Sequence, residues 1–158
     1  MLLCQKKMVS INEINNFLDN KDIAVIGASR NKNKFGFIVL NSLKEKQYNV
    51  YPVNPCIEKI GDIKCYSDVE NLPKHIISAI FITKPEVTEV IVNKICELGN
   101  IQHLWFQKGS ESTTAIETAK KYCTNVITNE CILMFIKSSG FPHNFHKFIK
   151  KVFRNHPK

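Results

Sequence analysis

Short apolar runs alternate with segments of helical spacing along most of the chain, and this alternation constrains the fold more than any other feature. The runs at residues 23–26 and 76–82 are almost continuously apolar, as in strands that are buried on both faces of a parallel sheet. Residues 10–20 and 86–98 instead place apolar side chains three or four positions apart, which is typical of amphipathic helices. We therefore predict an α/β chain with a Rossmann-like three-layer architecture, a parallel sheet with helices on both faces.

Local signals indicate where these elements begin and end. Ser10 and Glu13 form a capping box at the first helix, and Gly99 is a C-terminal signal for the helix that begins at Glu86. In chain order we expect a helix at 10–20, a strand at 23–26, a helix at about 37–48, a strand in 49–55, a turn with a brief third strand and a short helix in 60–73, a strand at 76–82, a helix at 86–98, a strand in 103–109, a helix at 112–123 and a strand in 125–131. We divide the chain into an N-terminal helix at 1–20 packed on the core, a domain at 21–132 and an extension at 133–158.

The composition is that of an ordinary globular protein and excludes several classes. A length of 158 residues fits one domain, with 44% hydrophobic and 23% charged residues. No apolar run approaches the ~20 residues that a membrane span requires, and the apolar patch near the start is too short for a signal peptide. The six cysteines are scattered without a C-x-x-C pair, so we expect reduced thiols rather than disulfides or a zinc site. We therefore predict a cytoplasmic protein without a transmembrane segment or a metal site.

Small, polar and basic residues follow the predicted strands where each strand ends. Ligands of such sheets bind at the carboxyl ends of the strands, near the point where the strand order reverses. These corners are Gly27-Ala28-Ser29-Arg30, Val53-Asn54-Pro55, Thr83-Lys84-Pro85, Gln107-Lys108-Gly109 and Asn129-Glu130-Cys131. The first corner leads into a helix whose N-terminus offers backbone N–H groups, while Ser29 adds a hydroxyl and Arg30 and Lys34 add full charges. The corners together predict a site for a phosphate-bearing ligand.

Two common phosphate-binding motifs do not fit the first corner. A Walker loop ends in Gly-Lys-Ser/Thr, but here Gly27 is followed nine residues later by Gly36-Phe37. A dinucleotide site usually has an acidic residue at the end of the second strand for the ribose hydroxyls, and this chain has Asn54 there. This residue disfavours NAD. An NAD(H)-binding Rossmann domain, acting as a redox-responsive regulator or as an oxidoreductase fragment, stays the alternative.

Several segments, taken in order, carry a resemblance to a known family. They are "GASRNKNKFGFIVLNSL", "VYPVNP", "IGDIKCYSDVENLP", "ITKPE" and "LWFQKGSES". Over about residues 20–132 the chain resembles the stand-alone coenzyme A-binding domains. That family is similar to the amino-terminal domain of the succinyl-CoA ligase alpha chain and of the NDP-forming acyl-CoA ligases. The resemblance implies a Rossmann-like fold in which the first corner holds the pyrophosphate of CoA or an acyl-CoA.

Carried over residue by residue, the resemblance assigns contacts along the ligand. It implies that Ala28, Ser29 and Arg30, in the corner that Gly27 opens, face phosphate and that Lys34 reaches the phosphates. It also implies that Asn54 and Pro55 flank the nucleotide and that Lys84 and Pro85 line the adenosine side. Gln107 and Gly109 would border the pantetheine path. Two interpretations of Cys131 stay open. It is either a buried structural thiol or a contact to the thiol of the ligand, which would give a mixed disulfide under oxidation.

The spacing of the histidines identifies no catalytic machinery. The similar ligases work through a phosphorylated histidine on a second domain and a nucleotide-grasp subunit, and neither fits in 158 residues. We interpret His75 and His103 as structural or solvated, and the other three histidines belong to the basic end of the chain. We therefore predict a CoA-binding module without autonomous ligase chemistry rather than an enzyme.

The end of the chain is strongly basic. Six Lys and Arg residues and no acidic residue follow Cys131, and the segment from Phe145 onward has the spacing of an amphipathic helix. Such a helix docks on its own domain or on a second copy in a homodimer, lies on a membrane surface, or binds nucleic acid. We favour docking, which leaves CoA or acyl-CoA, and no nucleic acid, as the expected partner.

Overall fold

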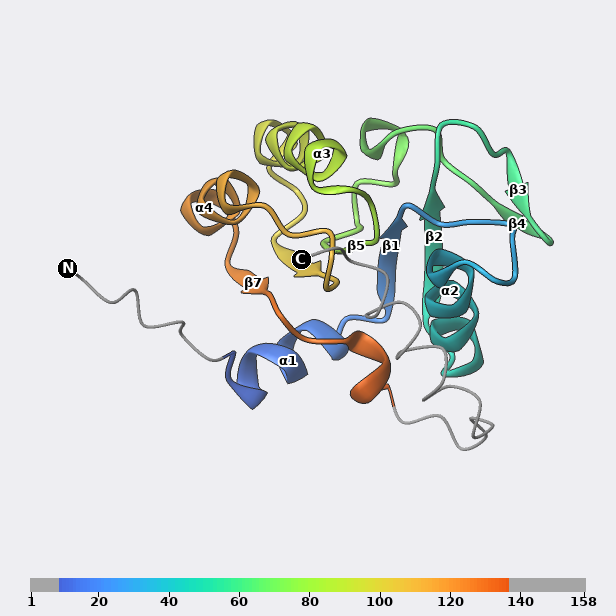
Figure 1. Cartoon of the computed structure of the whole chain (residues 1–158), viewed down its shortest axis with the longest axis horizontal. Helices are drawn as coiled ribbons and strands as arrows, with labels where there is room; N and C mark the ends of the chain where they lie inside the picture. The colour runs from blue at the N-terminus through green and yellow to red at the C-terminus, as the bar shows by residue number, and fades with distance from the viewer. Residues whose placement is uncertain (1–8, 137–158) are drawn as a thin grey trace, which may run out of the picture.

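A five-stranded parallel sheet, in the order β2-β1-β5-β6-β7, forms the centre of the computed structural model, which describes residues 9–136 (Figure 1). The strands of this sheet are β1 (Asp22–Ile26), β2 (Asn49–Val53), β5 (Ser78–Phe81), β6 (His103–Phe106) and β7 (Asn125–Ile127). The helices are α1 (Ile11–Leu18), α2 (Phe35–Glu45), α3 (Pro85–Leu98) and α4 (Thr113–Tyr122), with 3-10 turns η1 (Val69–Asn71) and η2 (Ile132–Met134). The predicted α/β architecture is confirmed.

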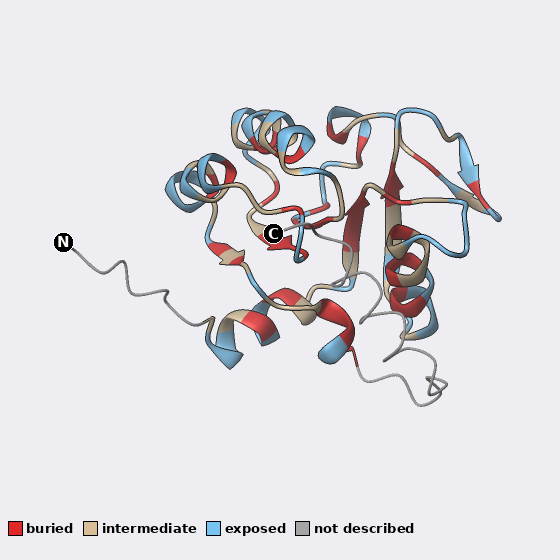
Figure 2. Ribbon diagram, viewed as in Figure 1, coloured by how far each residue is buried: buried red, intermediate tan, exposed pale blue. Residues whose placement is uncertain are grey.

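Helices cover both faces of the sheet (Figure 1). α1, α2 and η2 pack on one face, and α3, α4 and η1 pack on the other. Side chains alternate along each strand, so Val25 and Trp105 lie in the core beneath α1 and α2, whereas Ala24 and Leu104 lie in the core beneath α3 and α4. Figure 2 shows the buried residues concentrated in the strands and on the helix sides that face them. The sheet is thus the middle of three layers.

The helix α1 is fixed at its start and along its buried side. Glu13 donates its backbone N–H to the Ser10 hydroxyl over 3.2 Å, and its carboxylate accepts the Ser10 backbone N–H over 2.7 Å, so the predicted capping box is confirmed. Phe17 is fully buried and meets Trp105 edge-on, with ring centroids 5.3 Å apart. These contacts hold α1 over β6 and β7.

The segment at 60–73 corrects the prediction of a third strand in the series. Its two short strands, β3 (Lys59–Ile60) and β4 (Ile63–Lys64), pair antiparallel in a hairpin apart from the main sheet. One parallel bridge, between Val53 and Tyr66, ties the segment to the end of β2. The expectation of β-structure in this segment was therefore correct. However, two strands of two residues each form a small hairpin rather than a full strand of the main sheet.

The chain path puts the loop after β1 at a reversal of strand order. From β1 the chain moves outward to β2 and then crosses back to β5, which lies on the other side of β1. Ligands of open α/β sheets bind at such a point, outside the carboxyl ends of the strands. The parallel strands all begin at one end of the sheet and finish at the other. We call the end at which they finish the carboxyl edge and the end at which they begin the amino edge.

Candidate functional site

The loop after β1 and the first turn of α2 approach each other more closely than side chains would allow. Gly27 has a φ of 89°, and a Cβ there would stand 2.9 Å from the carbonyl group of Ile82. A Cβ on Gly36 would stand 2.3 Å from the Gly27 carbonyl oxygen. The two glycines therefore let the N-terminus of α2 press against the loop, so that its partial positive charge faces the carboxyl edge.

Hydrogen bonds fix the shape of this first loop. Asn31 donates its backbone N–H to the Ser29 hydroxyl over 3.1 Å, and Asn54 donates its side-chain amide to the Ala28 carbonyl over 2.9 Å. The Asn54 side-chain oxygen accepts the backbone N–H of Cys56, also over 2.9 Å. Both ends of the Asn54 amide are thus used inside the protein, where they hold the ends of β1 and β2 together.

The first of two grooves at the carboxyl edge, the α3 groove, has a volume of about 260 Å³. Its lining is Ile26, Gly27, Val53, Asn54, Pro55, Ser67, Asp68, Val69, Thr83, Val87, Val90, Ile91 and Lys94. Val87 and Val90 are 45% and 59% exposed, although the sides of α3 that carry Val92 and Ile95 are buried. A mainly apolar groove with exposed valines on its rim suits a flat apolar group better than water.

The second groove, the β6 groove, lies on the other side of Thr83 and has a volume of about 250 Å³. Its lining is Phe35, Ile82, Thr83, Lys84, Gln107, Lys108, Gly109 and Ser110. Ser110 is buried and donates its hydroxyl to the Gln107 carbonyl over 2.6 Å, which stabilises the tight turn at Gly109 (φ 97°). Because Thr83 lines both grooves, they meet at the end of β5 beside the first loop.

The structure brings together half of the predicted site residues as groove lining. Gly27, Asn54 and Pro55 line the α3 groove, whereas Lys84, Gln107 and Gly109 line the β6 groove. Lys84 therefore shares its groove with the residues predicted for the pantetheine path. Ala28, Ser29, Arg30, Lys34, Pro85 and Cys131 line neither groove.

Those six residues have other surroundings. Ala28 is fully buried in the core, so only its backbone can face a ligand, whereas Arg30 and Lys34 are exposed on the loop. Pro85 is the first residue of α3, after the N-cap Lys84. Cys131 is half-buried against the core and precedes η2, whose Ile132 donates its backbone N–H to the Gln107 side chain over 3.2 Å. Gln107 thus connects the β6 groove to the segment that carries Cys131.

The sequence prediction missed the ion pair on the wall of the α3 groove. Lys94 of α3 pairs with Asp68, and the Asp68 carboxylate also accepts the backbone N–H of Val69 over 2.6 Å. Burial raises the pKa of Asp68, but the hydrogen bonds from Lys94 and Val69 outweigh it and lower the pKa overall. The bond to Asp68 raises the pKa of Lys94. The sequence did contain a signal for this wall of the groove. Positions 87, 90, 91 and 94 form a second stripe at helical spacing beside the core stripe of α3.

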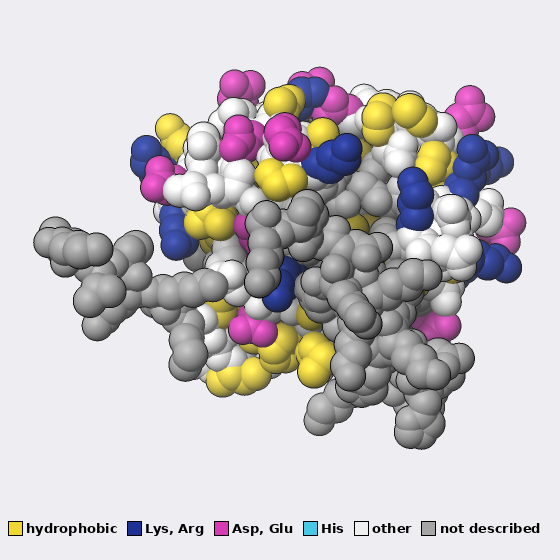
Figure 3. Space-filling model, viewed as in Figure 1, with side chains coloured by type: hydrophobic (Ala, Val, Ile, Leu, Met, Phe, Trp, Pro, Cys, Tyr) yellow, Lys and Arg dark blue, Asp and Glu magenta, His cyan; other side chains and the backbone are white. Residues whose placement is uncertain are grey.

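A wide hollow beside the hairpin adjoins the α3 groove and carries basic residues. It has a volume of about 900 Å³ and shares Pro55 and Ser67 with the α3 groove. Lys59 and Lys64 line it, and the Lys64 ammonium lies 4.9 Å from the centre of the Tyr66 ring. Figure 3 shows Lys and Arg side chains gathered at the hairpin end of this face, whereas Asp and Glu side chains gather over α3.

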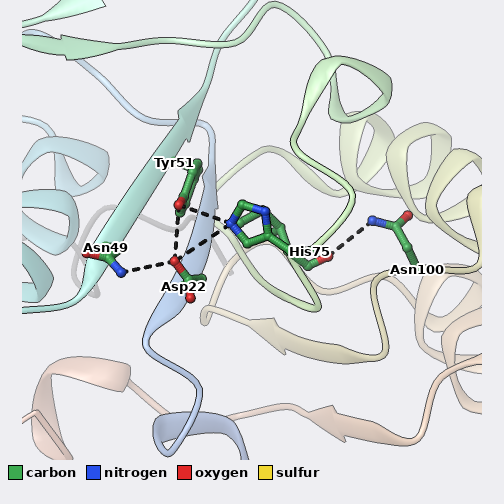
Figure 4. Close-up of polar contacts among 6 residues, drawn as sticks. Asp22, Asn49, Tyr51, His75 and Asn100 are labelled. Carbon is green, nitrogen blue, oxygen red and sulfur yellow. Dashed lines mark hydrogen bonds and ion pairs between the residues drawn. The ribbon is translucent and has the colours of Figure 1, made fainter.

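The amino edge has a polar cluster of a different kind (Figure 4). The Asp22 carboxylate accepts hydrogen bonds from the Asn49 side chain (3.0 Å) and the Tyr51 hydroxyl (3.1 Å). His75 Nε2 lies 3.3 Å from the Tyr51 hydroxyl and 4.0 Å from Asp22. Burial, followed by the bond to Asp22, raises the pKa of Tyr51. Because these groups satisfy one another and His75 is exposed, the cluster ties β1 to β2 at the surface.

Burial makes three of the five cysteines within residues 9–136 poor nucleophiles. Cys56, Cys65, Cys96, Cys123 and Cys131 are free. Burial raises the pKa of Cys123 to about 12, and it also raises the pKa of Cys65 and Cys96. A thiol with a raised pKa is a poor nucleophile, because the thiolate is the reactive form.

Two features are absent from residues 9–136. None of the helices there is long and apolar enough to cross a membrane. The same residues contain no group of three or more His, Cys, Asp or Glu side chains that could hold a metal ion.

Comparison with known proteins shows the family of the chain. The family described as "CoA binding domain" matches residues 21–137. An ADP-forming acetate–CoA ligase of Methanocaldococcus jannaschii is 34% identical over 77 residues, which cover 49% of this chain and 10% of the ligase. The alpha subunit of ADP-forming acetate–CoA ligase II of Pyrococcus furiosus is 29% identical over 126 residues, which cover 73% of this chain and 28% of the subunit.

Among solved structures, a small protein has a similar fold. A conserved hypothetical protein from Pyrococcus furiosus superposes with a TM-score of 0.69 and 35% identity, over 72% of this chain and 97% of that one. The chain therefore spans only a small part of the ligases that it matches, but the match covers nearly all of this protein. The match supports the resemblance that the sequence motifs indicated.

Proposed function

The chain belongs to the family of CoA-binding domains, and we propose that it is a module that binds CoA or a short acyl-CoA across the carboxyl edge, without ligase chemistry of its own. The observation that carries this proposal is the meeting of two grooves at Thr83, beside a loop that two glycines hold against the N-terminus of α2. A CoA molecule has a flat base at one end, phosphates in the middle and a long flexible arm at the other. The carboxyl edge offers an apolar groove, a cationic helix N-terminus and a second groove in the same order.

The pyrophosphate would lie at the first loop. Backbone N–H groups at a helix N-terminus bind anions, and Arg30 and Lys34 add full charges at the surface of the same loop. Lys34 is the N-cap of α2, and its side chain makes no capping hydrogen bond to the backbone N–H groups of the first turn. Ser29 precedes Arg30 in this loop, and its hydroxyl already accepts the Asn31 N–H, which leaves the hydroxyl proton for a phosphate oxygen.

The adenosine would enter the α3 groove, and the pantetheine arm would enter the β6 groove. Pro55, Val87 and Val90 give the α3 groove apolar walls for a base. Gln107 and Gly109 line the β6 groove together with Lys84, the N-cap of α3. This arrangement keeps the contacts predicted for Asn54, Pro55, Gln107 and Gly109 and brings Lys84 toward the phosphates.

The 3′-phosphate would project into the hairpin hollow. Lys59 and Lys64 line this hollow, and it opens next to Pro55 of the α3 groove. NAD and dephospho-CoA lack this phosphate, so they would gain nothing from the two lysines. Changing both lysines to Gln should therefore weaken the binding of CoA and leave that of dephospho-CoA almost unchanged.

Cys131 would stand near the thiol end of the ligand. Its neighbour Ile132 is bonded to Gln107, which lines the β6 groove. Under an oxidant such as a low-molecular-weight disulfide, the CoA thiol and the Cys131 thiol would then form a mixed disulfide, with the two protons and two electrons passing to the oxidant. Mass spectrometry of Cys131→Ser against the unchanged protein, after incubation with CoA disulfide, tests this contact.

The main experiment is a thermal unfolding series with ligands. A ligand at a hundred times its Kd stabilises the folded state by about 2.7 kcal/mol, which corresponds to a rise of roughly 5–10 °C in Tm for a domain of this size. We expect such a rise with CoA, a smaller one with dephospho-CoA and a slight one with NAD, because Asn54 stands where NAD sites place a carboxylate. If NAD stabilises the protein more than CoA does, the alternative of an NAD(H)-binding domain replaces this proposal.

Two variants of Ser29 separate charge from size at the first loop. Ser29→Glu sets an anion against the phosphates and should abolish the shift with CoA. Ser29→Gln has nearly the same volume without the charge and should keep a large part of the shift. An equal loss in both variants, with Tm unchanged in the absence of ligand, would mean that bulk rather than charge controls the loop.

The absence of ligase activity is a separate part of the proposal. The purified chain, incubated with acetate, CoA and ATP or GTP, should form no acyl-CoA above the rate without protein. Steady turnover that Ser29→Ala or Lys84→Ala abolishes would contradict it.

A cytoplasmic location, where CoA is available, and a homodimer formed through residues 133–158 belong to the same proposal. Size-exclusion chromatography with and without residues 138–158 tests the dimer. Residues 137–158 lie outside the described part of the chain.

A further inference from the structure

A row of polar residues lies at the amino edge, on the face of the sheet that α1 covers. Ser78 of β5 pairs in register with His103 of β6, and His103 pairs with Asn125 of β7. Residues that pair directly in adjacent parallel strands point to the same face, and side chains alternate along each strand. Trp105 lies two positions after His103 and packs against Phe17 of α1, so the whole row points toward the α1 side.

Each member of the row has a buried polar atom without a hydrogen-bond partner within residues 9–136. These atoms are Ser78 Oγ, His103 Nδ1 and Asn125 Oδ1. Ser78 is 0% exposed and Asn125 is 5% exposed. A buried polar group without a partner destabilises a protein by about 1–3 kcal/mol, and the large majority of such groups in folded proteins have a partner. Three of them on three neighbouring strands point to a shared occupant.

We propose that this row is a binding site for two internal water molecules, which hydrogen-bond Ser78, His103 and Asn125 beneath α1. Adjacent strands are about 4.8 Å apart, and one water bridges two polar atoms up to about 5.6 Å apart, or twice a hydrogen-bond length. His103 Nδ1 makes a single hydrogen bond, so one water would join it to Ser78 Oγ, and a second water, bonded to the first, would reach Asn125 Oδ1. Ser78 and Asn125 stand on strands about 9.6 Å apart, too far for a single water to join.

The chemistry of the row favours water over an ion. Asn125 Oδ1 only accepts hydrogen bonds, so the occupant must donate one, which excludes a simple anion. Burial lowers the pKa of His103, and the ring is therefore neutral at pH 7, with one nitrogen that accepts and one that donates. None of the three side chains carries a charge that would bind a metal ion or a phosphate. Water both donates and accepts, and it matches all three groups.

The site would also help to attach α1. The Asn125 side chain donates its amide to the Glu13 carbonyl of α1 over 2.7 Å, so its oxygen and nitrogen are directed to the row and to the helix respectively. The Glu13 carbonyl fixes the orientation of this amide, because a carbonyl oxygen only accepts and needs the N–H₂ group as its donor. A water on Asn125 Oδ1 would then supply the hydrogen bond that the amide oxygen lacks within residues 9–136.

A crystal structure of the full chain, at a resolution that shows ordered water, tests the proposal directly. We expect two density peaks within about 2.7–3.2 Å of Ser78 Oγ, His103 Nδ1 and Asn125 Oδ1. A row without these peaks overturns the proposal, either because the three atoms stay unpartnered or because the His103 ring or the Asn125 amide is flipped onto a protein partner.

The sign of a stability change gives a second test that does not need crystals. Ser78→Ala removes one polar group from the row. If water binds there, one bridging contact is lost and Tm falls, by about 2–4 °C for a typical hydrogen bond in a domain of this size. If the row is dry, the change removes an unsatisfied hydroxyl and Tm rises, which overturns the proposal. Ser42→Ala on α2, where Ser42 is 5% exposed, calibrates the effect of losing a buried hydroxyl elsewhere.

Discussion

The two edges of one sheet treat polar groups in opposite ways. At the carboxyl edge the first loop and the turn at Gly109 have positive φ values, Arg30 and Lys84 are exposed, and two grooves remain between the loops. At the amino edge Asp22, Tyr51 and His75 bind one another at the surface (Figure 4), and the row at Ser78 faces inward. The difference teaches that the same strands supply a binding surface at one end and structural cross-links at the other. Each prediction below separates the two edges.

The largest effect is expected from Gly36→Ala. The added methyl group would stand 2.3 Å from the Gly27 carbonyl oxygen, so α2 or the first loop must shift. Overpacking of this kind destabilises a protein by about 1–3 kcal/mol, and we expect the upper end because the clash is with backbone. Thermal or urea unfolding measures the loss, and calorimetric titration should show that CoA no longer binds.

Gly61→Ala in the hairpin is the control for the first prediction. Gly61 has a φ of 60°, but a Cβ there meets nothing within 4 Å. Only the cost of a left-handed conformation applies, about 1 kcal/mol. Equal losses in the two variants would show that the close approach of α2 to the loop does not matter for stability.

The next effect compares two asparagines at the ends of the same strand, β2. Asn54→Ala removes the bonds to the Ala28 carbonyl and the Cys56 N–H, and it should cost about 1–2 kcal/mol and weaken the binding of CoA about tenfold. Asn49→Ala removes one exposed bond to Asp22 and should change stability by no more than about 0.5 kcal/mol. The account is wrong about Asn54 if both variants bind CoA as tightly as the unchanged protein.

The third prediction concerns pH and the amino edge. Burial lowers the pKa of His103 in the folded state below the value of about 6.5 that it has in the unfolded chain. The unfolded state therefore binds more protons in this range, and Tm should fall as the pH is lowered from 7 to 5. In His103→Gln this part of the pH dependence should disappear, while the Kd for CoA at pH 7.5 should not change. A slope that persists in the variant would contradict this assignment.

The smallest effect is expected from the rim of the α3 groove. Val90 is 59% exposed, so Val90→Ser should leave Tm within about 1 °C. It also removes apolar contact with the adenine, and we expect the binding of CoA to weaken about threefold. Ile77 is 37% exposed and precedes β5 at the amino edge, so Ile77→Ser should leave the binding of CoA as it is. Equal affinities in the two variants would place the base outside the α3 groove.

The sequence predicted those features that depend on neighbouring residues. The capping box at Ser10 and the glycine that ends α3 are local signals, and both are found where the sequence indicated them. The corners at Gly27 and Asn54 were also predictable, because parallel strands bring their carboxyl ends to one edge.

Other features depend on register and packing, which one sequence does not reveal. The ion pair of Asp68 and Lys94 joins two segments whose distance is set by the fold of the hairpin region. The row of Ser78, His103 and Asn125 exists only because three strands pair in one particular register. A brief strand was predicted within residues 60–73, but its pairing in a separate hairpin depends on the turn geometry at Gly61.

The most direct test of the central claim is a titration of ¹⁵N-labelled protein with CoA, followed by the shifts of backbone amides. The account predicts large shifts at Gly27, Ser29, Thr83, Val90 and Gly109 of the carboxyl edge. It predicts almost none at Asp22, Tyr51, His75, Ser78 and His103 of the amino edge. Shifts that concentrate at the amino edge, or no shifts at millimolar CoA, would contradict the claim that the carboxyl edge is the binding surface.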